Sequence, residues 1–533
     1  MARDGAGRRR QLVTVAPDRA KLPPMTASES DCDDLILGAG MAGLTVGALL
    51  AKAGRRVVVL EAHDQPGGYA HTFAMGKYRF CAQVHYIFGC GEGGTIHRFL
   101  ERIGLVDEIA FHRLDPDGFD QIVVAGERFR IPSGFPAHRD RLIARFPEAA
   151  GPLQQYFDIV AGIADELAAL PDKITWRDVL SAPLRFPRLL RYRSFTLQRL
   201  YDQLAMPRLL QAVLAGQSGD YLLPPEEVSL LLHVSLIDNY GRGAYYPEKH
   251  FAHFIDSIVA TIRAQPGCAV LLDREIGRIV VDAGRVVGVE TKGGERYAAR
   301  RYISNIDPAR TVSLVQGAEW PRRYRRQVDY DYSCSTFTMY LGLKNLDLRE
   351  HGFGSWNVWH YPHDDLNRMY RDQLVGHDLS NPWLFLATPT LHSSEPGLAP
   401  PGEQILEVAT ACDYGYFQRL RAESRAAYTK AKLAIRDRIF EVLEQHYVPN
   451  LRKHLAMRVA GTPLTNAEFC RAPRGNAYGT ALTPAQMASR VDFETPIPNL
   501  FLVNASAGYP SIGGTIGSGM RLYDQVLRSR SDA

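Results

Sequence analysis

One stretch near the start of the chain, residues 34–68, constrains the fold more than any other segment. It reads DLILGAGMAGLTVGALLAKAGRRVVVLEAHDQPGG, which predicts a strand, a tight turn, a helix and a second, parallel strand. Gly38 permits the turn, Gly40 lets the backbone approach a pyrophosphate, and Gly43 lets the helix pack closely on the sheet. Glu61 follows near the offset of about 20 residues at which an acid accepts a hydrogen bond from a ribose. The stretch therefore predicts a dinucleotide site in an α/β fold.

Two other features of the sequence suggest competing interpretations. Gly89, Gly91 and Gly94 repeat the glycine spacing, but no buried strand precedes them and no strand ending in an acid follows. We therefore expect them to form an ordinary turn. Residues 35–51 carry no charge, yet this run is rich in Gly and Ala and falls short of the ~20 residues of a membrane-spanning helix, which favours a helix inside a soluble domain.

Several short motifs beyond the first stretch resemble one family of enzymes. They are the segments 61–68 (EAHDQPGG), 71–73 (HTF), 78–80 (YRF), 84–87 (VHYI), 462–469 (TPLTNAEF) and 472–479 (APRGNAYG). Together they resemble the phytoene desaturase, carotenoid isomerase and retinol saturase family of FAD-dependent oxidoreductases, and most of all its retinol saturase branch. The similarity covers about residues 34–90, 240–310 and 460–527, and it is looser in between.

The resemblance implies a Rossmann-like, two-dinucleotide-fold FAD-binding domain with an inserted mixed α/β substrate domain and a helical cap. The implied cofactor-binding residues are Gly38, Gly40, Met41, Ala42, Gly43, Glu61, Gly67, Gly68, His71, Thr72, Ile276, Asn305, Ser506, Gly513, Gly514, Thr515 and Ile516. The glycine-rich start of the last helix would lie near the pyrimidine edge of the flavin, where the helix dipole stabilises negative charge. The family usually places an acid after the final strand, where this chain has Ser506.

The pattern of apolar residues divides the chain into several parts. Residues 1–33 have no periodic apolar pattern and are predicted to be a disordered extension. The FAD-binding domain is expected to be discontinuous, comprising 34–95, 240–310 and 460–533, with four short strands between 269 and 304. Residues 96–239 are predicted to form a helical cap that faces substrate and membrane, and 311–459 a substrate domain. Aromatic residues concentrated in the latter suit either a tunnel for an apolar ligand or an ordinary core.

The composition argues against a nucleic-acid partner, a disulfide-stabilised fold and a metal site. The net charge of +4 over 533 residues gives no reason to expect a nucleic acid. The 7 cysteines form no CxxC pair, and their odd number argues against a disulfide framework, so we expect a reducing, cytoplasmic compartment and no metal site. Residues 183–200 contain arginines, no acid and interleaved apolar residues, which predicts a peripheral contact with an anionic membrane. The alternative is that these arginines form the exposed, basic face of a helix that packs on the rest of the protein.

The sequence leads to one main functional hypothesis and two alternatives. The main one is an FAD-dependent oxidoreductase acting on carbon–carbon double bonds of a polyene or isoprenoid lipid, by saturation, desaturation or isomerisation. His85, Tyr86 and Tyr246 are the candidates for proton transfer. No second dinucleotide motif identifies the electron donor or acceptor. The alternatives are a flavin amine oxidase, and a flavin-less lipid-binding protein, for which the lost acid at Ser506 is the sequence argument.

Overall fold

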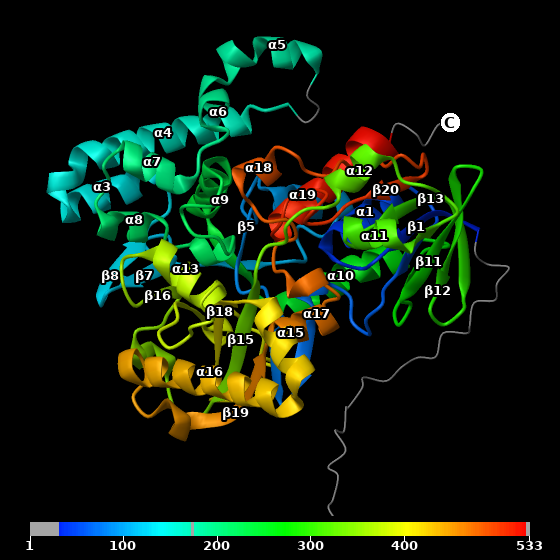
Figure 1. Cartoon of the computed structure of the whole chain (residues 1–533). Coiled ribbons are helices and arrows are strands. Elements are labelled where there is room, and N and C mark those ends of the chain that lie inside the picture. The colour runs from blue at the N-terminus through cyan, green and yellow to red at the C-terminus, as the bar shows by residue number, and fades with distance from the viewer. Residues whose placement is uncertain (1–30, 172–174, 529–533) are drawn as a thin grey trace, which may run out of the picture.

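The computed structural model describes residues 31–171 and 175–528, and its first sheet is assembled from three distant parts of the chain (Figure 1). Five strands run parallel in the order β10, β2, β1, β13, β20. Their bounds are β1 (Asp31–Leu37), β2 (Val57–Leu60), β10 (Ala269–Leu271), β13 (Arg296–Ser304) and β20 (Leu500–Leu502). The long strand β13 (Arg296–Ser304) also pairs antiparallel with β12 (Arg285–Thr291), which pairs antiparallel with β11 (Ile276–Asp282). At the edge, β14 (Val315–Gln316) pairs in parallel with β11. The predicted strands between 269 and 304 are thus confirmed.

Helix α1 (Met41–Lys52) is the centre of the first domain. Every residue from Met41 to Ala51 is buried, because α10 (His250–Arg263), α19 (Ile512–Leu522) and α2 (Thr95–Ile103) pack around it. Small residues on α1 and α19 allow this close approach. Buried Asp34 of β1 accepts hydrogen bonds from Arg301 of β13 at 2.5 and 3.1 Å, and these bonds join the two strands. Asp34 also forms an ion pair with Arg55.

The start of the chain differs in one respect from the prediction. Residues 31–33, assigned to the disordered extension, belong to β1. Asp31 and Cys32 pair with Ala298 and Ala299 of β13, so backbone pairing holds this polar segment in the sheet although its side chains have no strand-like pattern. The remainder of the predicted extension, 1–30, lies outside the described residues.

A second sheet forms the other half of the molecule. Its order is β19, β15, β18, β17, β16, β7, β8. The strands are β7 (Asp120–Val124), β8 (Glu127–Ile131), β15 (Ser335–Leu343), β16 (Asn357–Tyr361), β17 (Leu384–Ala387), β18 (Gln404–Cys412) and β19 (Leu455–Gly461). One face packs against α16 (Arg425–His446) and α15 (Tyr414–Glu423) through an apolar cluster.

The segment 96–239 is not purely helical, which corrects the predicted boundary of the cap. Strands β7 and β8 form a hairpin at Ala125 and Gly126, both with positive φ, and β7 pairs in parallel with β16 of the second sheet. Both faces of β7 are buried, so it lacks the apolar–polar alternation by which a strand is recognised in a sequence. The cap therefore shares a sheet with residues 335–461.

Helices of the cap cover the upper left of Figure 1. They are α3 (Phe135–Arg145), α4 (Ala150–Ala168), α5 (Trp176–Arg185), α6 (Pro187–Tyr192), α7 (Leu197–Gln203), α8 (Arg208–Leu214) and α9 (Leu230–Arg242). Helix α5 stands away from the rest of the molecule. Shorter helices elsewhere are α11 (Pro308–Leu314), α12 (Arg322–Gln327), α13 (Leu366–Leu374), α14 (Pro389–His392), α17 (Pro463–Phe469) and α18 (Pro484–Met487).

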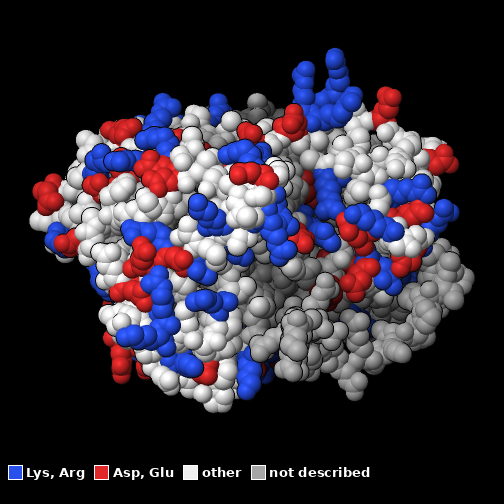
Figure 2. Space-filling view, turned by 60° about the horizontal axis from the view of Figure 1, so that its bottom comes forward, with Lys and Arg blue, Asp and Glu red and all other residues white. Residues whose placement is uncertain are grey.

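Two small sheets lie between the halves. One pairs β3 (Thr72–Met75) with β4 (Tyr78–Cys81), and the other has the order β5 (Ile87–Phe88), β9 (Ala244–Pro247), β6 (Phe111–Arg113). All 7 cysteines lie in the described part of the chain and are free, as expected. Each helix of that part is too short or too polar to cross a bilayer. On the face in Figure 2, basic and acidic side chains are intermingled.

Candidate functional site

A cavity of about 360 Å³ lies where the two halves meet. Its walls come from the turns after β1, β2, β13 and β20, from residues 83–88, and from the second sheet. One side is lined by glycines and backbone groups, and the other mainly by aromatic and aliphatic side chains. A single cavity therefore connects the predicted dinucleotide site with an apolar chamber.

The turn that leads into α1 is closed too tightly for any side chain. Gly38 has a φ of 102°, and a Cβ at Gly43 would lie 2.4 Å from the Gly38 carbonyl oxygen. A Cβ at Gly40 would lie 2.5 Å from the side-chain amide of Asn305, at the end of β13. With its oxygen turned toward Gly40, that amide accepts from the Gly40 N–H at 3.1 Å and donates to the Val503 carbonyl at 2.9 Å. These contacts fix the backbone where a pyrophosphate would bind.

Glu61 lies at the tip of β2 and borders the cavity. Its carboxylate accepts from the backbone N–H groups of Ala39 at 2.6 Å and His63 at 2.9 Å. Burial raises its pKa, against these hydrogen bonds, which lower it. Each oxygen retains a further lone pair for a ribose hydroxyl. The carboxylate is therefore held in the position that the motif predicts.

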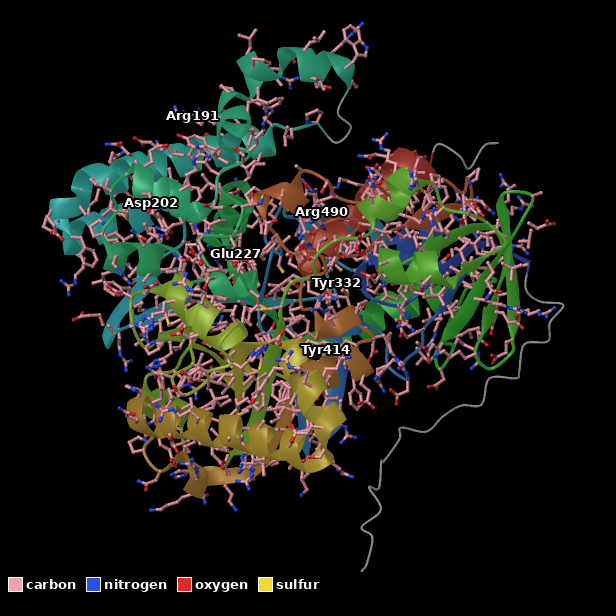
Figure 3. All side chains as sticks on the ribbon, in the orientation of Figure 1. Arg191, Asp202, Glu227, Tyr332, Tyr414 and Arg490 are labelled. Carbon is pink, nitrogen blue, oxygen red and sulfur yellow. The ribbon has the colours of Figure 1, made fainter. Side chains whose placement is uncertain are left out.

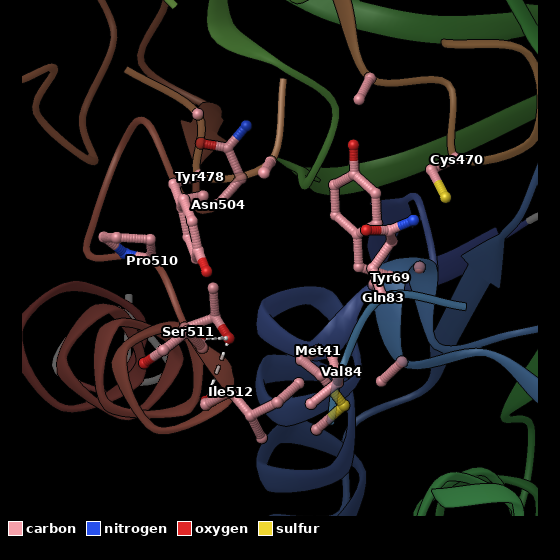
Figure 4. A pocket seen from close by; sticks show the side chains of 18 of the residues that line it. Met41, Tyr69, Gln83, Val84, Cys470, Tyr478, Asn504, Pro510, Ser511 and Ile512 are labelled. Atoms are coloured by element: carbon pink, nitrogen blue, oxygen red, sulfur yellow. Dashed lines mark hydrogen bonds between the residues drawn. The ribbon is translucent and has the colours of Figure 1, made fainter. Parts of the chain in front are cut away.

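Two helix N-termini face the cavity from adjacent positions. Met41 and Ala42 of α1 line it, as do Ile512, Gly513 and Thr515 of α19, and Figure 4 shows Met41 and Ile512 near each other. Neither helix has an acid in its first turn. Both positive dipole ends are therefore available to anionic groups of a ligand.

The chain after β20 has Ser506 at the position where the resembled family usually has an acid. Asn504 accepts from the N–H groups of Ser506 and Ala507 at 2.9 and 2.8 Å, and the Ser506 hydroxyl accepts from the Thr480 N–H at 3.2 Å. A carboxylate nevertheless borders this part of the cavity, because Asp307 follows the adjacent strand β13. It accepts from the hydroxyls of Tyr330 and Tyr332, each at 2.8 Å. Tyr332 is labelled near the centre of Figure 3.

Most residues predicted to bind the cofactor line this cavity. Those that do are Gly38, Gly40, Met41, Ala42, Glu61, Gly67, Gly68, His71, Ile276, Asn305, Ser506, Gly513 and Thr515. His71 donates from Nδ1 to the Gly68 carbonyl at 2.7 Å, and burial lowers its pKa, so its ring is neutral near pH 7. The glycines of the second motif are absent from the lining, in agreement with their interpretation as a turn.

Four predicted cofactor residues lie outside the lining. Gly43 lies beneath the turn, and the Gly514 N–H is bonded to Ser511, the N-cap of α19. Ile516 is fully buried on the inner face of that helix. Thr72 faces His250, whose ring lies 3.3 Å from its hydroxyl. These residues shape the walls and do not border the cavity.

The three candidates for proton transfer have different surroundings. His85 and Tyr86 line the cavity, whereas Tyr246 is fully buried outside its lining, packed against Phe251. On strand β9 successive side chains point to opposite faces, which placed Tyr246 in the core. Tyr246 therefore does not border the cavity, and its role in proton transfer stays a prediction.

His85 is paired with a carboxylate that the sequence analysis missed. Its Nδ1 lies 2.6 Å from an oxygen of Glu407, which sits in the middle of β18 and is fully buried. Burial raises the pKa of Glu407, and the contact with His85 opposes this. Such a pair fixes the orientation of the imidazole and leaves its other nitrogen for the cavity. The missed signal was a single acid inside the apolar strand 404–412.

Tyr86 joins two further acids that were also missed. Its hydroxyl oxygen lies 2.5 Å from Asp220 and 3.1 Å from Asp120. Asp120 also accepts from Gln217 at 2.7 Å and from Asn357 at 3.3 Å. Burial raises the pKa of Asp120 to about 7 and raises the pKa of Asp220 well above its usual value. Asp220 borders the cavity beside an apolar wall formed by Leu222, Leu236, Tyr240, Trp359, Trp383 and Phe385.

Comparison with known proteins defines the class of this fold. Residues 36–103 match the family described as an NAD(P)-binding Rossmann-like domain. An oxidoreductase from Methanosarcina mazei has a TM-score of 0.62 at 17% identity, covering 92% of this chain and 100% of that one. Cyclohexylamine oxidase from Brevibacterium oxydans has a TM-score of 0.60 at 18% identity, covering 94% and 99%. The fold is thus that of Rossmann-type oxidoreductases.

Sequence comparison identifies more similar proteins over nearly the whole chain. The chain is 28% identical to the all-trans-retinol 13,14-reductase of Danio rerio, covering 93% of this chain and 86% of that protein. It is 27% identical to the Homo sapiens protein of that name, with 97% and 90% covered. Identity to the chloroplastic prolycopene isomerase of Arabidopsis thaliana is 24%, with 91% and 80% covered. The predicted resemblance to retinol saturases and carotenoid isomerases is confirmed.

The Asp120–Asp220 pair predicts an unusual dependence of stability on pH. Both folded-state pKa values lie above those of the unfolded chain, so the folded state retains protons that the unfolded chain releases. The free energy of unfolding should fall as pH rises, on the order of 2 kcal/mol between about pH 5 and about pH 7 from Asp120 alone. Asp120→Asn should remove that part, measured by urea denaturation.

A surface acid provides the control for this measurement. Asp117→Asn, at a side chain that is 79% exposed, should leave the pH dependence of the wild type unchanged. Parallel curves for the wild type and Asp120→Asn would contradict the account.

Proposed function

We propose that the protein is an FAD-dependent oxidoreductase that acts on a carbon–carbon double bond of a polyene or isoprenoid lipid. The observation that carries the proposal is the single cavity that joins a dinucleotide cradle to an aromatic and aliphatic chamber. The similarity to all-trans-retinol 13,14-reductases and prolycopene isomerases, over nearly the whole chain, supports this substrate class.

The residues of the cradle fit FAD in shape and polarity. The turn at Gly40 would receive the pyrophosphate at the N-terminus of α1, and Glu61 would accept from a ribose hydroxyl. The N-terminus of α19, at Ile512 and Gly513, would stabilise negative charge at the pyrimidine end. Bound FAD supplies hydride transfer to or from a carbon of the substrate.

The protein's own part in the chemistry is to exclude water and to move a proton. His85 is suited to proton transfer because its ring borders the chamber, and buried Glu407 compensates a positive charge on it. Phe385, whose ring centroid lies 5.2 Å from that of His85, belongs to the apolar wall. In saturation His85 would donate the proton, and in desaturation it would accept it.

The two alternatives give different results in simple measurements. An amine oxidase would reduce its flavin with amines in the absence of oxygen, and not with polyenes. Its support is limited to the fold, because the amine oxidases of similar structure are less than 20% identical to this chain. A flavin-less lipid-binding protein would contain no flavin even after incubation with FAD.

The glycine turn provides the first test of the proposal. The purified protein should show the visible absorption of a flavin and release FAD on denaturation. Gly43→Ala should weaken FAD binding by at least about tenfold, because the added Cβ would lie 2.4 Å from the Gly38 carbonyl oxygen and force the turn apart. Flavin content per chain, after dialysis against known FAD concentrations, measures this.

Gly151→Ala is the matched control, since an added Cβ there meets no atom within 4 Å. Both variants should retain the circular dichroism spectrum of the wild type. A wild-type protein that holds no FAD at saturating concentration would overturn the proposal.

The second test addresses proton transfer. His85→Ala should lower turnover of a polyene substrate by about a hundredfold, within the usual range for loss of a general acid or base. Glu407→Gln should lower it less, because the amide still orients the ring and only the charge is lost. Turnover per bound flavin is the quantity to measure. His112→Ala, at a histidine that contacts Ser355 and does not line the cavity, is the control. Unchanged turnover in His85→Ala would exclude this role.

We also propose that helix α5 contacts the surface of an anionic membrane. Trp176, Leu180 and Leu184 are 68%, 71% and 88% exposed and recur every four residues, so they form one stripe along the helix. Helix α5 buries no side chain and protrudes from the molecule (Figure 1). An apolar stripe beside basic residues is typical of helices that bind at the interface of anionic lipid.

We place the proposed contact on α5, which precedes most of the predicted segment 183–200. The arginines of 183–200 are exposed, but several of its apolar residues, among them Leu189, Leu197 and Leu200, are buried in the cap. Arg188 pairs with Glu166, at 3.6 Å. Arg191, labelled in Figure 3, lies below α5 on α6.

Liposome flotation tests the membrane contact. The triple variant Trp176→Ser, Leu180→Ser, Leu184→Ser should lose most of its binding to vesicles with anionic lipid, because burial of the apolar stripe drives binding. Val375→Ser, at another apolar side chain that is 75% exposed, should bind as the wild type does. Equal flotation of the triple variant and the wild type would contradict the proposal.

A further inference from the structure

A positively charged side chain, Arg490, lies directly behind one wall of the cavity. That wall is the turn after β20, where Asn504, Ala505 and Ser506 line the cavity. The Arg490 guanidinium donates from Nη2 to the carbonyl oxygen of Ala505 at 2.5 Å and to that of Ser506 at 3.3 Å. These hydrogen bonds hold the charge of Arg490 against the wall, at the position where the resembled family usually has an acid.

The charge of Arg490 has no acidic partner among the described residues. Arg490 forms no ion pair there, and its Nε is buried without a hydrogen-bond partner. Its guanidinium packs 5.2 Å from the ring centroid of Tyr509, and Arg521, which also has no acidic partner in that part of the chain, packs 5.0 Å from the same ring. Burial, together with Arg521, lowers the pKa of Arg490 to about 10, so it stays charged near pH 7.

The segment that carries Tyr509 leads directly into helix α19. Tyr509 is followed by Pro510 and Ser511, which line the cavity and precede the first turn of the helix (Figure 4). The N-terminus of α19 is the place proposed above for the pyrimidine end of FAD. The charge of Arg490, labelled in Figure 3, and the positive end of the helix dipole therefore act on the same end of the cavity.

Asp307 borders the cavity and is the acid that could oppose this charge. Its carboxyl group accepts from the hydroxyls of Tyr330 and Tyr332, each at 2.8 Å, and from the N–H of Arg310 at 3.2 Å, as the N-cap of α11. Three donors and a helix N-terminus thus already compensate a negative charge on Asp307. The groups that accept from Arg490 are neutral, so its charge is the uncompensated one at this wall.

We propose that Arg490 raises the reduction potential of the bound flavin by stabilising the negative charge of its reduced form. The inference rests on the FAD-binding part of the proposed function and concerns which electron donors can serve the protein. Reduction by a hydride equivalent adds two electrons and one proton, so the flavin gains one negative charge. A cation in a partly buried wall acts strongly on that charge because the local dielectric is low. A donor too weakly reducing for free FAD can then reduce the bound flavin.

The test compares the reduction potentials of FAD-loaded proteins. Wild type, Arg490→Met and Arg490→Lys are reduced anaerobically together with a reference dye of known potential, and absorption gives the oxidised fractions of flavin and dye. Arg490→Met keeps a long side chain and removes the charge, so the equilibrium should shift at least about tenfold toward oxidised flavin, or about 30 mV for a two-electron couple. Arg490→Lys should keep most of the wild-type potential. Arg458→Met, at an exposed arginine of β19, is the control and should match the wild type.

The flavin content of each protein separates a changed potential from a loss of binding. Equal potentials of the wild type and Arg490→Met overturn the inference and leave the proposed function intact. A potential that falls equally in Arg490→Met and Arg490→Lys also overturns it, because the lysine retains the charge. Should both variants fail to fold, the wild type decides, since a potential at or below that of free FAD contradicts the inference. A wild type that binds no FAD overturns the proposed function and this inference with it.

Discussion

The contact between the glycine turn of α1 and Asn305 is the constraint on which the rest of the structure depends. It holds the ends of β1 and β13 side by side, with a Cβ at Gly40 excluded by the Asn305 amide. Asn305 in turn donates to Val503, which follows β20. Three segments distant in the sequence are thereby brought to one edge of the sheet, and the N-termini of α1 and α19 face the same cavity. Ligands of open parallel sheets bind at this edge.

The second sheet supplies the apolar wall of the cavity and the carboxylate that contacts His85. Its strands supply the aromatic wall, and β18 supplies Glu407 behind His85. The consecutive residues His85 and Tyr86 point to different acids, one to Glu407 and the other to the Asp120–Asp220 pair. The proposed proton-transfer group and the contact with a pair of buried acids therefore lie on one short segment at the junction.

The dinucleotide-binding turn of the first domain was predictable because the residues that form it are close together in the sequence. The spacing of Gly38, Gly40 and Gly43 and the position of Glu61 depend on the nearby backbone, so the sequence shows them directly. The position of Asp307 beside Ser506 was not predictable, since it depends on the pairing of β13 with β20. Asp120, Asp220 and Glu407 were missed for a similar reason, since only the packing of segments distant in the sequence places Asp120 and Asp220 against Tyr86 and Glu407 against His85.

The prediction of a purely helical cap failed because local patterns carry no information on tertiary burial. The strand at Asp120–Val124 is apolar on both faces and was included in a helical cap. Tyr246 is buried in the core, which strand alternation along β9 explains and a local motif does not reveal. In the arginine-rich segment, likewise, the sequence did not show that Leu189, Leu197 and Leu200 would be buried.

The central claim is that a bound flavin and the chamber together change a carbon–carbon double bond. The most direct measurement is the anaerobic incubation of the FAD-loaded protein, oxidised and chemically reduced, with a polyene, followed by separation and mass analysis of the polyene. The account predicts a product that has gained or lost two hydrogens, or a geometric isomer of unchanged mass, formed only with the flavin-loaded protein. Recovery of the unchanged polyene from both redox states would contradict it.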